Sequence, residues 1–364
     1  MKFCITTVST SWDEIPRARH QIAEELLRAG HQVIFVEKNK IGFPRIQIRA
    51  EKPGLTIITP FSPVDYRLRY RLPLINEIYQ IWFFPRLRRM FGDVVVINFD
   101  FTAHLLHRFF KRNIYYCNDE YIGNSSRPFL LVEIYHKFIE QRVVKKSCFC
   151  VSTTAYLTRK LSRSNQRVYE IPLGGPPPQQ TSASRCFEKR KQLKIGLMGA
   201  IQTGHVSVDI INRLLKEPDF KLIFIGNVGE EFRKQVKDIG QVDLKGVLTG
   251  AALFREMVSF DVAIAPYNLE KINAGVTPNK LFQYLACACP VVISAIPNIK
   301  EIHYPRGTVY VANNGTEFVE NIRKAYSEDC SDYARARLQY AAENTWEKRV
   351  KLFLTHLKEN GLIE

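Results

Sequence analysis

Residues 275–292 read GVTPNKLFQYLACACPVV, and this stretch predicts the local structure around which the second half of the chain is built. Thr277 is a favourable helix N-cap, and Pro278 suits the first helical position, where its missing N–H costs nothing. Pro290 prevents the helix from continuing into the apolar strand 291–293. The stretch therefore predicts a short helix, ending near residues 286–288, that leads into a buried strand.

Lys280 lies in the first turn of this helix, where its charge opposes the positive end of the helix dipole. A cation beside free backbone N–H groups is favourable if an anion binds there, and phosphate is the usual one. Gln283 and Tyr284 follow three and four residues later and share the face of Lys280. The alternative is a solvated lysine on an ordinary helix, and spacing alone leaves both interpretations open.

The chain is strongly basic, with a formal net charge of +16 over 364 residues. Residues 1–173 hold 27 basic and 15 acidic side chains, whereas residues 174–364 hold 25 and 21. The excess of positive charge therefore belongs mainly to the first half. This asymmetry favours an anionic surface, lipid or polymer as the partner of that half.

The cysteines and the N-terminus indicate a cytoplasmic protein. The 8 cysteines show no zinc-like pairing of C-x-x-C units, so reduced thiols are expected and no metal site is predicted. The chain starts directly with a strand, without a signal peptide. No apolar run approaches the roughly 20 residues of a membrane-spanning helix.

Strands and helices alternate along both halves, which predicts an α/β fold with two mostly parallel sheets. The stretch 174–192 is rich in Gly, Pro, Ser and Gln and is the expected linker between domains 1–173 and 193–343, with a C-terminal helical segment at 344–364. The expected strands are 2–8, 31–37, 55–59, 94–98, 114–117, 148–153, 193–199, 221–225, 261–266, 291–293 and 308–311. The expected helices are 14–29, 74–90, 127–146, 155–162, 206–216, 230–239, 251–258, 316–326 and 333–358, besides the one already described.

The segment 66–91 combines basic and aromatic residues. Such a segment can lie in the headgroup region of an anionic membrane. The alternative is an ordinary surface helix whose aromatic side chains pack inward. The residues predicted to contact a membrane or acceptor are Arg67, Arg69, Arg71, Trp82, Arg86, Arg88 and Arg89.

With both domains placed, the chain resembles the GT-B glycosyltransferases, in particular the group 1 type and the enzymes of bacterial exopolysaccharide assembly. The segment TPNKLFQYLA at 277–286, followed by PVV at 290–292, resembles the family pattern P-x-K-x-x-E-Y-L-A-x-G-x-P-V-V. The segment YYCNDE at 115–120 resembles the pattern Y-D-x-x-D-D more loosely. The resemblance implies two Rossmann-like, doubly wound domains that face each other across a cleft, with the C-terminal helix crossing back to the first domain.

Three positions depart from the family pattern. Gln283 occupies the place of the usual ribose-binding Glu, and Gly275 that of an earlier Glu near the sugar. Ala288 or Cys289 replaces the usual Gly. A Gln can still accept from one ribose hydroxyl and donate to another, and the Lys-x-x-Gln version is similar to the xanthan-type glucuronosyltransferases.

The resemblance implies a nucleotide-sugar donor, with a UDP-sugar favoured, and neither a cofactor nor a metal. Charge that builds on the leaving diphosphate is then stabilised by a helix N-terminus and a basic side chain. We expect Gln283 to contact the ribose. Tyr267 is a candidate base or phosphate neighbour and the loop 199–202 a second diphosphate contact, and for each of these two a purely structural role is an equal alternative. The residues expected to bind the donor are Gly199, Gln202, Tyr267, Val276, Thr277, Asn279, Lys280 and Gln283.

Inversion of configuration is favoured, and it requires a general base that takes the proton of the acceptor hydroxyl. Asp119, which follows the strand 114–117, is the first candidate, and Asp100, which follows 94–98, is the second. Asp13, His20 and His104 rank behind them.

These features together predict a monomeric glycosyltransferase, peripheral on the inner face of the cell membrane, that acts on a lipid-linked or cell-surface polysaccharide acceptor. A nucleotide-sugar 2-epimerase of the same fold is the alternative, although acidic residues are scarce near Lys280. A catalytically inactive sugar-binding homologue also fits, because of Gln283 and Gly275. No RNP, helix-turn-helix or zinc pattern supports nucleic-acid binding.

Overall fold

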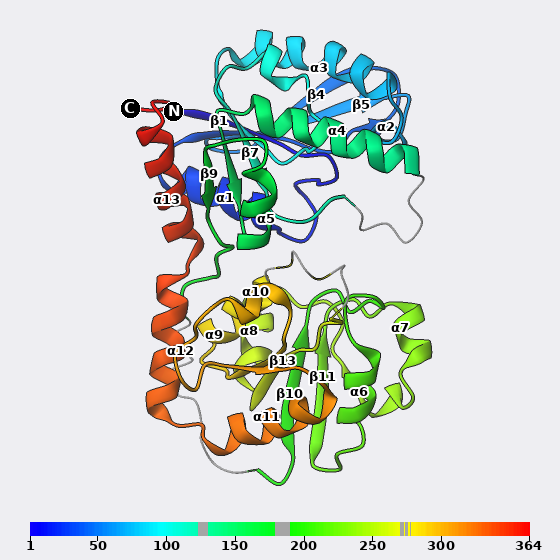
Figure 1. The fold of residues 1–364 in the computed structure, drawn as a ribbon, viewed down its shortest axis with the longest axis vertical. Coiled ribbons are helices and arrows are strands. Elements are labelled where there is room, and N and C mark those ends of the chain that lie inside the picture. Colours follow the sequence, from blue (N-terminus) through cyan, green and yellow to red (C-terminus); the bar gives the residue numbers. More distant parts are fainter. Residues whose placement is uncertain (123–129, 179–189, 270–272, 274–275, 277) are drawn as a thin grey trace. The chain divides into compact units, whose positions relative to one another are not determined.

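The structure is a computed structural model of the 364-residue chain, and it describes residues 1–122, 130–178, 190–269, 273, 276 and 278–364. The chain forms two compact units. Unit 1 comprises Met1–Leu173 and Arg349–Glu364, and unit 2 comprises Gly174–Lys348. Figure 1 shows a sheet flanked by helices in each unit.

Unit 1 is built on a nine-stranded sheet in the order β3-β5-β2-β1-β6-β7-β8-β9, with β4 paired to β5. Every pair is parallel except β4–β5, which is antiparallel. The strands are β1 (Lys2–Thr6), β2 (Gln32–Val36), β3 (Lys40–Ile41), β4 (Arg45–Lys52), β5 (Leu55–Ser62), β6 (Val95–Asn98), β7 (Asn113–Cys117), β8 (Phe149–Ser152) and β9 (Val168–Glu170). The helices are α1 (Ala18–Arg28), α2 (Tyr66–Arg69), α3 (Ile75–Phe91), the 3-10 helix η1 (Leu106–Arg108), α4 (Leu130–Lys146), α5 (Ala155–Leu161) and α13 (Trp346–Glu359), which enters unit 1 at Arg349.

Alternating residues of β7 show which helices cover which face of this sheet. Tyr115 packs in one cluster with Val143 and Val144 of α4. The ring of the next residue, Tyr116, lies 6.2 Å from that of Phe353 in α13. Because successive strand residues point to opposite faces, α4 and α13 cover opposite faces of the sheet.

Unit 2 is built on a six-stranded, fully parallel sheet in the order β12-β11-β10-β13-β14-β15. The strands are β10 (Leu193–Met198), β11 (Phe220–Ile225), β12 (Asp243–Leu244), β13 (Val262–Ala265), β14 (Val291–Ser294) and β15 (Val309–Ala312). The helices are α6 (Val208–Leu214), α7 (Glu230–Gln235), the 3-10 helix η3 (Ile239–Gln241), α8 (Gly250–Val258), α9 (Asn279–Ala286), α10 (Pro297–Lys300), α11 (Gly315–Ser327) and α12 (Ser331–Glu343). The α/β class and the parallel sheets predicted from the sequence are thus confirmed.

The structure differs from the expected elements in several places. The single helix expected over 333–358 is two helices, α12 and α13, separated by Asn344 and Thr345. Gly175, in the expected linker, pairs with the junction between these two helices: it accepts from Trp346 N at 3.0 Å and donates to Asn344 O at 2.9 Å. Strand β4 was not predicted, because most of its side chains are exposed and give no apolar pattern.

The turn after α9 explains one departure from the family pattern. Ala288 has a φ of 54°, in the left-handed region that glycine adopts most easily. It follows the C-cap residue Cys287, and its carbonyl accepts from Arg337 Nε. Ala288 is therefore the residue that stands in the place of the family's glycine.

Candidate active site

Helix α9 begins at the carboxyl edge of the unit 2 sheet, where parallel α/β sheets bind ligands. Pro278 is its N-cap residue and Asn279 its first residue, so the helix starts one position later than predicted. Thr277 and Gly275 lie outside the described residues. The carbonyl of Val276 accepts from Asn298 Nδ2 at 3.1 Å, which anchors the chain just before the helix. Asn279 Oδ1 is buried without a hydrogen-bond partner among the described residues.

The Lys280 side chain is half-buried beside Tyr267 and Gly199. Its Nζ lies 5.1 Å from the centroid of the Tyr267 ring and 3.6 Å from the position that a Cβ on Gly199 would take. Burial lowers the pKa of the Lys280 ammonium to about 8. No acidic side chain of the described residues pairs with it. The site therefore holds a desolvated cation at a helix N-terminus, an arrangement that an anion would stabilise.

Two glycine turns lie side by side at the ends of β10 and β11. Gly199 has a φ of 123° and Gly226 one of 124°. A Cβ on Gly226 would lie 2.0 Å from the carbonyl oxygen of Gly199, so only glycine permits this approach. Gln202 Oε1 lies 2.3 Å from where a Cβ on Gly229 would be, so its side chain packs on the backbone after the second turn.

A polar network holds the loop that follows β13. Asn273 Nδ2 donates to the carbonyls of Asn268 at 2.8 Å and His205 at 3.1 Å, and its Oδ1 lies 3.0 Å from His205 Nδ1. Tyr267 itself bridges to Val206. This network positions the Tyr267 ring under Lys280.

The two residues expected on the face of Lys280 have different roles. The Tyr284 hydroxyl accepts from Met198 N at 2.6 Å and is fully buried, so it ties α9 to the end of β10. Gln283 is half-buried and makes no hydrogen bond to other described residues. Gln283 thus remains available to a ligand, and Tyr284 does not.

Asp119, the first candidate base, follows β7 and is partly exposed. Its Oδ1 accepts from Glu120 N at 2.8 Å. Asp100 is buried, accepts from Thr102 N at 2.8 Å and from Thr102 Oγ1 at 2.6 Å, and lies 3.8 Å from Arg69. This carboxylate caps its own turn, so the structure argues against Asp100 as the base.

The lower-ranked candidates also have structural partners. Asp13 forms an exposed ion pair with Arg49 at 3.1 Å. The two ring nitrogens of His20 contact Arg17 N at 2.9 Å and Ser11 O at 3.0 Å. His104 lies between Thr102 O at 3.1 Å and Glu77 at 3.2 Å.

The predicted membrane residues separate into exposed and buried groups. Arg69 is buried and donates to Asn39 and Asn76, so its assignment to a membrane contact is wrong. Trp82 is half-buried and Arg88 pairs with Asp93. The exposed members are Arg67, Arg71, Arg86 and Arg89.

Residues 192–328 match the family model for glycosyl transferases, group 1. The chain is 23% identical over 267 residues to TuaH of Bacillus subtilis strain 168, described as a teichuronic acid biosynthesis glycosyltransferase. That match covers 68% of this chain and 66% of TuaH, just under two thirds of the relative.

Three solved structures share the architecture. Sucrose-phosphate synthase from Thermosynechococcus elongatus has a TM-score of 0.76 at 13% identity, with 99% of both chains covered. A Burkholderia xenovorans trehalose-phosphate synthase in complex with glucose-6-phosphate has a TM-score of 0.73 at 11% identity, covering 98% of this chain and 99% of the other. WaaG, a glycosyltransferase involved in lipopolysaccharide biosynthesis, has a TM-score of 0.65 at 16% identity, covering 97% and 99%.

Residues 192–328 thus match the group 1 glycosyltransferases, and the whole chain has the two-domain fold of the GT-B structures. The expected family and fold are thus confirmed. In unit 2 the sequence pattern located Lys280 and Gln283, but it missed His205, Asn273 and Asn298. His205 and Asn273 lie in the segments after β10 and β13, Asn298 lies in the short helix α10, and no sequence pattern marks any of them.

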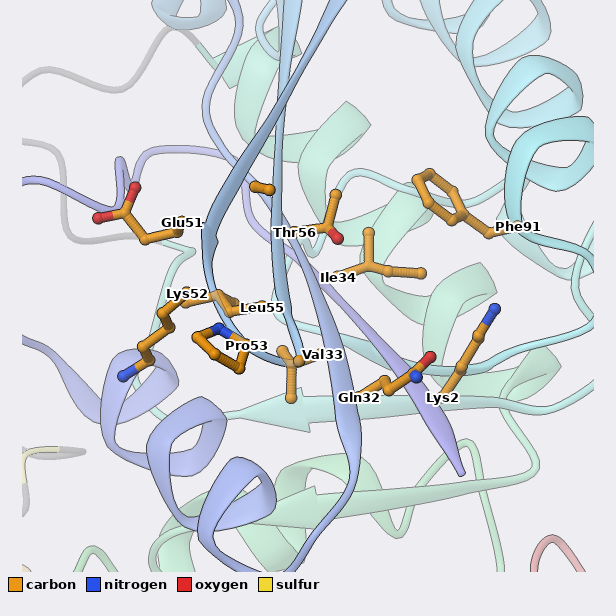
Figure 2. Close-up of a pocket in the computed structure, with 12 residues that line it drawn as sticks. Lys2, Gln32, Val33, Ile34, Glu51, Lys52, Pro53, Leu55, Thr56 and Phe91 are labelled. Carbon is orange, nitrogen blue, oxygen red and sulfur yellow. The ribbon is translucent and has the colours of Figure 1, made fainter.

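Unit 1 also has a groove with a volume of about 440 Å³. Figure 2 shows Lys2, Gln32, Ile34 and Phe91 around it. Lys2 and Gln32 are the first residues of β1 and β2, so the groove lies at the amino edge of the sheet. Ligands of parallel α/β sheets bind at the carboxyl edge, and this groove is therefore not our candidate active site.

Among the described residues, no three His, Cys, Asp or Glu side chains come together in a way that could hold a metal ion. Within the same residues, no helix is long and apolar enough to cross a membrane.

Proposed function

We propose that this glycosyltransferase transfers a sugar from a UDP-sugar to a hydroxyl of a lipid-linked or cell-surface polysaccharide acceptor, without a metal or cofactor and with inversion. The observation that carries the proposal is the desolvated Lys280 ammonium at the start of α9, next to the Gly199 turn. When the donor bond breaks, negative charge develops on the leaving diphosphate. A preorganised cation and backbone N–H groups stabilise that charge where water is excluded.

The relatives support the choice of substrates. TuaH is described as acting in teichuronic acid biosynthesis and WaaG in lipopolysaccharide biosynthesis, and both products are cell-surface polymers. One trehalose-phosphate synthase structure is described as UDP-forming and another structure as bound to UDP-2-fluoro glucose. In our proposal Gln283 binds the ribose of UDP, because its amide can both donate and accept.

Asp119 serves as the general base in this proposal. It lies at the carboxyl edge of the unit 1 sheet and is partly exposed, whereas Asp100 is buried. Trehalose-6-phosphate synthase, which has a related fold, is described as transferring with retention, so the stereochemistry needs a direct test. NMR of the first-formed product should show inversion, and a retained anomeric configuration would exclude this role of Asp119.

Binding is tested by thermal unfolding of the full chain with UDP, GDP, dTDP and CMP sugars in the presence of EDTA. We expect a rise in Tm with one UDP-sugar, since a ligand that binds only the folded state stabilises it. Lys280→Ala should abolish the rise. Asp119→Asn should keep the rise but lose transfer to the acceptor. A protein that responds to none of the donors would contradict the proposal.

The main alternative is a nucleotide-sugar 2-epimerase. Such an enzyme changes the donor sugar in the absence of an acceptor, whereas our proposal requires one. A catalytically inactive homologue would bind the donor and consume none of it. Donor turnover measured with and without acceptor therefore separates the three functions.

A further inference from the structure

We propose that the exposed faces of α3 and α4 form a surface that binds an anionic lipid bilayer. We call this surface the apolar face. Its members are large apolar side chains that are mostly solvent-exposed in unit 1. They are Leu74, Ile78 and Ile81 at α3 and Leu130, Leu131, Ile134 and Phe138 on α4.

The spacing of these residues places them on one stripe of each helix. Leu74, Ile78 and Ile81 follow each other at intervals of four and three, as Leu131, Ile134 and Phe138 do at three and four. The opposite sides of the two helices supply core residues such as Phe83 and Val143. The stripes therefore point away from the sheet.

A hydrogen bond joins the two helices beside the stripes. The Tyr135 hydroxyl of α4 donates to Glu77 Oε1 of α3 at 2.9 Å. Ile78 is the neighbour of Glu77 in the sequence, and Ile134 is the neighbour of Tyr135. The two isoleucines are 67% and 54% exposed. The two stripes thus form one surface, and Figure 1 shows α3 and α4 next to each other in unit 1.

Basic side chains are exposed on the same segments of the chain as the apolar face. The exposed ones in residues 66–91 and 130–146 are Arg67, Arg71, Arg86, Arg89, Lys137, Lys145 and Lys146. Arg142 lies 5.8 Å from the centroid of the Phe138 ring. The acidic side chains Glu77 and Glu133 are only 25% and 23% exposed, and Glu140 is buried against Lys160.

This combination of charge and exposure favours a bilayer over a protein partner. The cores of protein interfaces are depleted of charged residues, whereas interfacial membrane helices combine an apolar face with Arg and Lys that contact anionic headgroups. The inference extends the membrane contact predicted from residues 66–91 to helix α4 and changes the residues that make it. In that segment Phe83 and Phe84 are buried, and the α4 residues were not recognised.

The apolar face would also bring the enzyme to its acceptor, and this step rests on the proposed function. A lipid-linked acceptor stays in the bilayer, so an enzyme bound to the same surface meets it there. The donor site lies in unit 2, and donor binding therefore reports separately from lipid binding.

The test is co-sedimentation of the full chain with vesicles of phosphatidylcholine, with or without phosphatidylglycerol. We expect binding to the anionic vesicles that weakens with added salt. The double variant Ile78→Glu/Ile134→Glu should reduce binding by roughly tenfold or more, because each isoleucine loses its apolar insertion. The matched control is Leu352→Glu, since Leu352 is 38% exposed on α13, which covers the other face of the sheet.

Donor-induced stabilisation of both variants, measured as above, shows that they remain folded. Equal loss of vesicle binding in the control and the double variant would overturn the inference. A wild-type protein that binds its donor but neither type of vesicle would also overturn it. Self-association of the wild type that the double variant abolishes would assign the face to a second copy of the chain instead.

Discussion

Lys280 is a half-buried cation that lacks an acidic partner among the described residues, an arrangement that costs stability in the absence of a ligand. Burial lowers its pKa because the protein solvates the ammonium less well than water does. A bound diphosphate would reverse this effect by stabilising the charged form. The residue that recognises the donor should therefore also make recognition depend on pH.

We predict that UDP affinity falls as the pH rises above about 8, the pKa of Lys280 in the ligand-free protein. Below that pH the ammonium is already charged, and Lys280 adds no pH dependence. Above it, binding must take up a proton, which costs about tenfold in affinity for each pH unit. Isothermal titration calorimetry in buffers with different ionisation enthalpies measures both the affinity and the proton uptake.

Lys280→Arg provides the control for this titration. Arginine stays charged throughout the range. The affinity of the Lys280→Arg variant for UDP should therefore not fall between pH 8 and 10, whatever its value relative to the wild type. A wild-type affinity that does not change above pH 8 would contradict the assignment of Lys280 to the diphosphate.

Asp100 and Arg69 show what residue patterns miss at this scale. Both appeared functional in the sequence, one as a base and one as a membrane contact. In the structure they lie 3.8 Å apart and hold local structure through Thr102 and Asn76. Whether a charged side chain already has hydrogen-bond or ion-pair partners depends on spatial neighbours, and spacing along the chain does not reveal these.

At the scale of elements, the proposed donor site includes the contact between the turns after β10 and β11. Gly199 N donates to Ile225 O at 2.9 Å, and Gly226 N donates to Gly246 O at 2.7 Å. The first hydrogen bond joins the two turns, and the second ties the Gly226 turn to the chain after β12. The start of α9 was predictable from Pro278 and Lys280. The contact between the Gly199 and Gly226 turns was not, because it depends on β10 and β11 being neighbours in the sheet.

We predict that Gly226→Ala lowers the free energy of unfolding by about 2–4 kcal/mol and weakens UDP binding, since the new methyl clashes with the Gly199 backbone and φ is positive. The matched control is Gly246→Ala. Gly246 also has a positive φ, of 67°, but nothing lies within 4 Å of the position of its Cβ. The control should cost about 1 kcal/mol.

Urea unfolding and UDP titration of both variants measure these effects. Equal losses of stability would mean that backbone strain alone matters at Gly226. In that case the close approach of the two turns would not be essential for the donor site.

At the scale of the whole molecule, the end of the chain completes the first unit. From Arg349 on, α13 belongs to unit 1, where Phe353 and Leu357 are buried. The ring of Phe353 lies 6.2 Å from that of Tyr116 and 6.2 Å from that of Phe149. Unit 1 is thus formed from two segments that are far apart in the sequence.

We predict that Phe353→Ala lowers the free energy of unfolding of unit 1 by about 3–5 kcal/mol, the usual cost of removing a buried aromatic side chain. Leu352→Ala, at the exposed neighbouring position, should cost less than about 1 kcal/mol. Hydrogen exchange resolves the effect by element, and we expect faster exchange in β7 and β8. Unchanged exchange there would contradict the role of α13 in the core of unit 1.

The sequence by itself determined the α/β class, most strands and helices of both sheets, and the position of Lys280 at a helix start. Apolar periodicity, prolines and glycines act locally, so they can be read along the chain. Only the tertiary structure decided which polar side chains have hydrogen-bond partners, which glycine turns contact each other, and which faces of α3 and α4 stay exposed. These properties depend on contacts between residues distant in sequence, such as Gly199 with Gly226 and Glu77 with Tyr135.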